Sequence, residues 1–154
     1  MAAYNGRVRP AHLVLLAALG LGCGGGQHAA QTGPPAFEWA VSQGLWGDER
    51  LTIGTDGAAH YHFVSARGEP TIDRTAALDA GELEPLRAAT RLPAFCALRS
   101  ERDGIPDEGQ PTLVVRTGER DCTVTLWDGE WDEMPAARPA HDAIGRIIRR
   151  LKGR

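Results

Sequence analysis

The chain has 154 residues, of which 42% are hydrophobic and 24% charged, and this fits one globular domain. The length excludes a large multidomain enzyme, and the composition excludes a globally disordered chain. The 17 basic and 20 acidic residues give a net charge of −3, which argues against a nucleic-acid-binding protein because such proteins usually carry a basic excess.

Residues 1–22 have the composition of an export signal. Arg7 and Arg9 precede an apolar run that ends just before Cys23, and this run is about half as long as a transmembrane helix. The leucine-rich run followed by Gly-Cys resembles the lipobox of bacterial lipoproteins, in which the cysteine thiol is lipidated and becomes the mature N-terminus. The alternative is an ordinary secretory peptide that is cleaved nearby, with Cys23 incidental.

The lipobox resemblance implies a lipid anchor on Cys23 and a location at the bacterial cell envelope. Gly24, rather than Asp, follows the cysteine, and by resemblance to known sorting signals this favours the outer membrane. Residues 23–36 form the lipidated cysteine and a Gly-, Ala- and Pro-rich flexible tether, and residues 37–154 form the folded domain. The leader holds two of the 17 basic residues and no acidic residue, so the mature chain carries 15 basic and 20 acidic residues, a net charge of −5.

The two cysteines that remain after Cys23 are Cys96 and Cys122. An even number of cysteines in an exported domain predicts a disulfide, with two buried reduced thiols as the alternative. Their spacing is not C-x-x-C, so a redox-active pair is not expected.

The first half of the domain shows a hairpin pattern followed by a helix pattern. Alternating residues over 49–54 and 59–64 flank an Asp-Gly turn, which predicts two antiparallel strands. Asp79 and Glu82 have the spacing of a capping box, and apolar residues at helical spacing follow until Pro93.

The second half repeats this order. Alternation over residues 112–116 and 121–127 around Gly118 predicts a second hairpin, a loop over 128–138 follows, and an apolar stripe over 140–151 predicts a last helix. The order β-β-α-β-β-α predicts an α+β fold of two layers, an antiparallel sheet with both helices on one face.

The histidines and tryptophans are the candidate binding residues. His60 and His62 share one face of a strand, but no third metal ligand is identifiable, so we predict a solvent-facing pair and no metal site. Trp46, before the first predicted strand, and Trp131, within an acidic loop, are candidate anchors for a partner. The alternative for Trp131 is a side chain that covers an edge of the core.

Motifs typical of catalysis are missing from the sequence. None of the serines lies in G-x-S-x-G, and the sequence contains neither H-E-x-x-H nor a Gly-rich phosphate-binding loop. We therefore expect no catalytic residues, no cofactor and a domain that is not an enzyme.

Three short segments resemble a known group of small bacterial domains. They are residues 44–47 (Gly-Leu-Trp-Gly), residues 92–95 (Leu-Pro-Ala-Phe) and the last-helix stripe, and together they span about residues 39–152. The chain resembles emfourins, which inhibit thermolysin-like metalloproteases, and related lipoproteins of similar layout. The resemblance implies a protein partner but assigns an inhibitory contact to no position of this chain.

These observations predict a membrane-anchored lipoprotein whose domain binds or interacts without catalysis, with an envelope protein or a protease as the expected partner. The alternatives are an emfourin-like inhibitor of a secreted metalloprotease and an unrecognised envelope enzyme.

Overall fold

The computed structural model describes residues 33–42, 47–104, 108–119 and 121–153. The predicted leader, the lipidation site Cys23, most of the tether and Trp46 lie outside the described residues.

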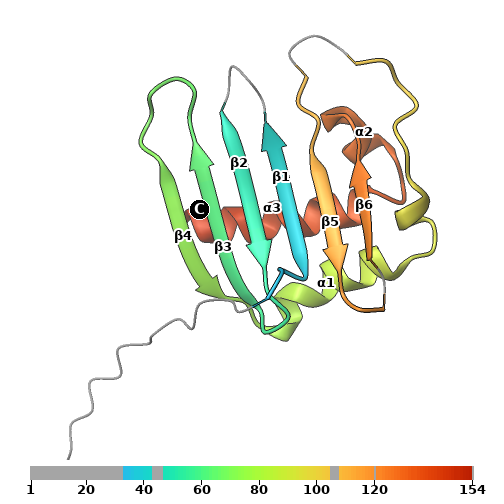
Figure 1. The fold of residues 1–154 in the computed structure, drawn as a ribbon, viewed down its shortest axis with the longest axis horizontal. Helices are drawn as coiled ribbons and strands as arrows, with labels where there is room; N and C mark the ends of the chain where they lie inside the picture. The colour runs from blue at the N-terminus through green and yellow to red at the C-terminus, as the bar shows by residue number, and fades with distance from the viewer. Residues whose placement is uncertain (1–32, 43–46, 105–107, 120, 154) are drawn as a thin grey trace, which may run out of the picture.

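Six antiparallel strands form one sheet, in the order β4-β3-β2-β1-β5-β6 (Figure 1). The strands are β1 (Phe37–Ser42), β2 (Asp48–Ile53), β3 (Ala58–Val64), β4 (Ile72–Ala77), β5 (Thr112–Arg116) and β6 (Asp121–Thr125). The helical elements are α1 (Ala80–Arg91), the short 3-10 helix η1 (Phe95–Ala97), α2 (Asp128–Glu133) and α3 (Arg138–Lys152).

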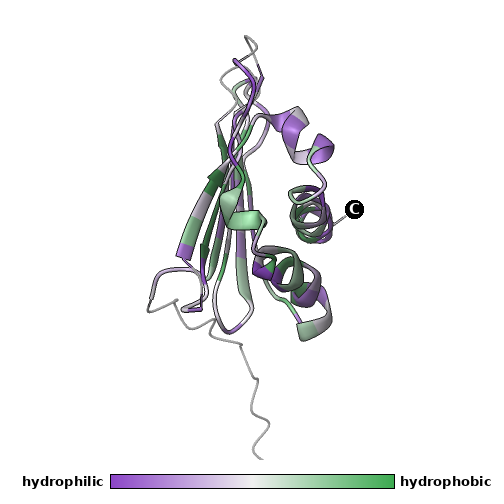
Figure 2. Cartoon of the chain, turned by 90° about the vertical axis from the view of Figure 1, so that its right-hand side faces the viewer, coloured by the Kyte–Doolittle hydropathy of each residue, from purple (hydrophilic) through white to green (hydrophobic). Residues whose placement is uncertain are grey.

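The helices cover one face of the sheet, and the other face is open (Figure 2). The core lies between the two layers, where alternate side chains of the strands meet the apolar side chains of α1 and α3. Among the core residues, Tyr61 of β3, Leu113 of β5 and Leu86 of α1 are fully buried. This arrangement confirms the predicted α+β fold with an antiparallel sheet and both main helices on one face.

Both main helices follow the predicted pattern. Asp79 is the N-cap of α1: its carboxylate accepts the Glu82 N–H at 2.9 Å, and the Glu82 carboxylate accepts the Asp79 N–H at 2.9 Å. All six residues of the predicted α3 stripe are buried, and the helix ends at Gly153 in the left-handed conformation (φ 75°). No helix in the described part of the chain has the length and apolar character needed to cross a membrane.

Two strands were missed by the sequence prediction, which recognised only the two hairpins. β1 is central: Phe37 lies opposite Ile53 of β2 on one side and Val115 of β5 on the other, so this strand joins the hairpins into one sheet. β4 is an edge strand without buried residues, so it lacks the alternation on which strand prediction depends.

The predicted loop over residues 128–138 is also wrong in its first half. Residues 128–133 form α2, which begins with a carboxylate contact like that of α1: Glu130 Oε2 accepts the Trp127 N–H at 2.9 Å. Because α2 is only six residues long, its hydrophobic pattern is too short to be recognised.

Candidate functional site

Two groups of charged side chains occupy the open face of the sheet. Successive side chains of a strand point to opposite faces of the sheet, so the neighbours of the buried Tyr61 point away from the helices, as predicted for His60 and His62. Strand pairing then sets Arg50 of β2 opposite His62 on one side and Asp73 of β4 opposite His62 on the other. These side chains line a shallow recess together with Pro35, Glu38 and Thr52.

The first group, which we call the His–Asp cluster, consists of His60, His62 and Asp73. Asp73 lies between the two histidines: its Oδ1 is 3.0 Å from His60 Nε2, and its Oδ2 is 3.1 Å from His62 Nδ1. Both hydrogen bonds lower the pKa of the Asp73 carboxyl, that from His60 more strongly, so this group is an anion at neutral pH. A carboxylate only accepts hydrogen bonds, so the ring nitrogens that face it are the donors.

The second group consists of Glu38 of β1 and two arginines. Glu38 Oε1 accepts hydrogen bonds from Arg50, with Nε at 3.1 Å, and Glu38 Oε2 accepts one from Arg116 Nη1 of β5 at 3.3 Å. The Arg50 hydrogen bond is the largest influence and lowers the pKa of Glu38; Arg116 adds to it, against the raising effect of burial. The positive charge of Arg50 is therefore directed toward Glu38.

Asp73 is the residue that sequence reasoning missed. The predicted solvent-facing histidine pair had no identifiable third ligand because β4, the strand that carries Asp73, was not predicted. Asp73 lies 11 residues beyond His62 and comes into contact with it only through the pairing of β3 with β4. A period-2 alternation centred on Asp73 would have been the local signal, and β4 does not show one.

The prediction that Trp131 is a candidate anchor for a partner is wrong, because this side chain is not accessible to a partner. Its side chain is fully buried, with its ring centroid 5.0 Å from that of Trp39, and its Nε1 donates to the Pro111 carbonyl at 3.3 Å. The alternative interpretation, a tryptophan that covers an edge of the core, agrees with this burial, since Trp131 belongs to the core itself. The other candidate anchor, Trp46, is outside the described residues.

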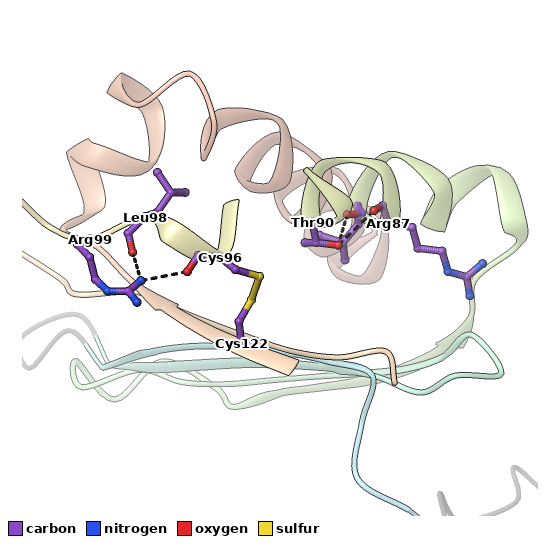
Figure 3. Close-up of a disulfide and its surroundings, with 7 residues drawn as sticks. Arg87, Thr90, Cys96, Leu98, Arg99 and Cys122 are labelled. Carbon is purple, nitrogen blue, oxygen red and sulfur yellow. Dashed lines mark hydrogen bonds between the residues drawn. A yellow bond between two sulfur atoms is a disulfide. The ribbon is translucent and has the colours of Figure 1, made fainter. Parts of the chain in front are cut away.

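The predicted disulfide between Cys96 and Cys122 is confirmed (Figure 3). It joins η1 to β6, with the two Cα atoms 5.8 Å apart. Arg99 Nη1 donates to the Cys96 carbonyl at 3.1 Å and to the Leu98 carbonyl at 2.6 Å, which fixes the chain after η1.

The described serines make local contacts. Ser42 donates to Asp48 at 2.7 Å, Ser65 accepts the Arg67 N–H at 3.1 Å, and Ser100 donates to the Arg102 carbonyl at 3.4 Å. None of these contacts is to a histidine, so they do not form a Ser–His pair of the kind used in nucleophilic catalysis.

Comparison with known proteins returned neither a matching family model nor a similar curated protein.

Proposed function

We propose that this protein is an exported lipoprotein, anchored through Cys23 to the bacterial outer membrane, whose α+β domain binds a charged ligand without catalysing a reaction. The observation that carries the proposal is the disulfide: Cys96 and Cys122 pair, as expected for a domain that folds in an oxidising compartment. The third cysteine, Cys23, directly follows the apolar run of the leader.

The binding part of the proposal is supported by the open face of the sheet. The helices cover one face only, and the opposite face carries the His–Asp cluster and the Glu38 ion pairs around a shallow recess. Side chains held by ion pairs in fixed positions present charges and hydrogen-bonding groups to a ligand without further ordering, which lowers the entropic cost of binding.

Metabolic labelling tests the anchor. Cells that express the full chain and receive labelled palmitate are expected to yield a labelled protein in the outer-membrane fraction, and Cys23→Ser is expected to abolish the label. Cys96→Ser, which leaves Cys23 in place, is the matched control and is expected to remain labelled. Label that persists in Cys23→Ser would contradict lipidation at this residue.

A protease assay tests the nearest alternative. An emfourin-like inhibitor would block a thermolysin-like metalloprotease at a near-stoichiometric ratio while its own chain stays uncut. The proposal predicts no such inhibition, and inhibition at that ratio would replace it. Turnover of a substrate by the purified chain would instead favour the envelope enzyme.

A further inference from the structure

The geometry points to a divalent transition-metal site on the open face of the sheet, in which His60, His62 and Asp73 bind Zn²⁺, Ni²⁺ or Cu²⁺. The inference deepens the proposed function by naming the charged ligand, and it rests on that proposal only for the use of this face.

The three side chains are already gathered at nearly ligand spacing. Their candidate ligand atoms all lie within 4.8 Å of one another, and Asp73 is 3.0 Å from His60 Nε2 and 3.1 Å from His62 Nδ1. Ligand atoms that share one ion at about 2.0–2.2 Å lie roughly 3–3.5 Å apart, so the three ligand atoms need to approach one another by only about 1–2 Å.

The surroundings allow a cation to reach this set. The side chains of His60, His62 and Asp73 are 47%, 41% and 60% exposed, so an ion from solvent meets no barrier. The cationic side chain on the adjoining strand, Arg50, is paired with Glu38, and this pairing offsets the repulsion it would exert. The carboxylate of Asp73, set between the two imidazoles, offers an oxygen ligand to the cation.

The donor set selects the class of metal. Ca²⁺ and Mg²⁺ require oxygen ligands, whereas two imidazole nitrogens with one carboxylate suit the later first-row transition metals. Binding replaces the proton on each ring nitrogen that now faces Asp73; this proton moves to the other ring nitrogen or leaves to solvent. Three protein ligands leave further coordination positions facing solvent, which makes the site open and the binding reversible.

Isothermal titration of the full chain, purified in detergent without a histidine tag, tests the site. Zn²⁺ and Ni²⁺ are expected to bind with one high-affinity ion per chain, and each of H60Q, H62Q and D73N is expected to weaken the binding at least tenfold. D132N is the matched control, because Asp132 makes a comparable contact of 2.8 Å with His141 but with a single histidine. The control is expected to bind as the unaltered chain does.

Paramagnetic broadening gives a test without substitution. Substoichiometric Ni²⁺ or Cu²⁺ is expected to broaden the NMR signals of His60, His62 and Asp73 before any others. Broadening centred on another histidine, equal affinity in the three variants and the unaltered chain, or no saturable binding would each overturn the site. Loss of palmitate label would leave these measurements unchanged, so failure of the anchor and failure of the metal site are distinguishable.

Discussion

Trp131 packs edge-on against Trp39, with the ring centroids 5.0 Å apart and the ring planes at 72°. This contact joins α2 to the central strand β1, and the Trp131 side chain is completely enclosed. A short helix built around an acidic segment is thereby held to the core by one large side chain.

Replacement of Trp131 by Ala is expected to lower the free energy of unfolding by about 3–5 kcal/mol, because it removes a buried aromatic ring and leaves a cavity. Urea denaturation measures the change. Leu92→Ala is the control: Leu92 is 46% exposed, and its loss is expected to cost about 0.5 kcal/mol or less. A Trp131→Ala protein as stable as the control would show that the indole does not support the core.

The disulfide is expected to stabilise the domain by restricting the unfolded chain. It links positions 26 residues apart, so Cys96→Ser combined with Cys122→Ser should cost about 2–4 kcal/mol. The same loss is expected when a reductant is added to the unaltered chain, and the reductant should leave the double variant unchanged. A denaturation midpoint that does not respond to reductant would contradict the contribution.

Local sequence patterns predicted the helices and strands that bury an apolar stripe of their own. They did not predict the elements whose formation depends on contacts between segments far apart in the chain. Ala140, Ile144 and Ile147 recur at helical spacing and are all buried in α3. The residues around Asp73 have no such pattern, because β4 is an edge strand that exists through its hydrogen bonds with β3. The His–Asp cluster therefore depends on strand register, which no single segment of the sequence encodes.

Gly57 lies in the tight turn between β2 and β3, where the backbone requires a glycine. Its φ is +85°, its carbonyl accepts the Leu78 N–H at 2.9 Å, and a Cβ at this position would lie 2.6 Å from the Leu78 carbonyl oxygen. Gly57→Ala is expected to cost about 2–3 kcal/mol, the sum of left-handed strain and a backbone clash. Gly68 has a similar φ of +78° with no atom near its Cβ position, so Gly68→Ala should cost only about 1 kcal/mol. Equal losses in urea denaturation would contradict the clash.

Glu130 gives the domain a stability that depends on pH. It is 2% exposed, and its carboxylate accepts the N–H groups of Trp127 at 2.9 Å and Glu101 at 3.1 Å. Burial raises the pKa of this carboxyl. The two N–H groups, the Ser100 hydroxyl and the charge of Arg102 lower it, and together they outweigh burial, so the pKa lies below its ordinary value of 4.5.

The pKa of Glu130 is lower in the folded than in the unfolded chain. The ionised carboxylate therefore adds fully to the free energy of unfolding above the ordinary glutamate pKa, and this contribution is lost as the pH falls through the lowered value. Glu130→Gln removes the charge and presents an amide to two N–H donors, so a loss of about 2 kcal/mol is expected at pH 7. The difference in the free energy of unfolding between Glu130→Gln and the unaltered chain, measured by urea denaturation, should be smaller at pH 3 than at pH 7. Glu133→Gln, at an exposed position of the same helix, is the control and should change the free energy of unfolding at pH 7 by about 0.5 kcal/mol or less. A Glu130→Gln deficit of equal size at both pH values would mean that the charge of this carboxylate does not stabilise the fold.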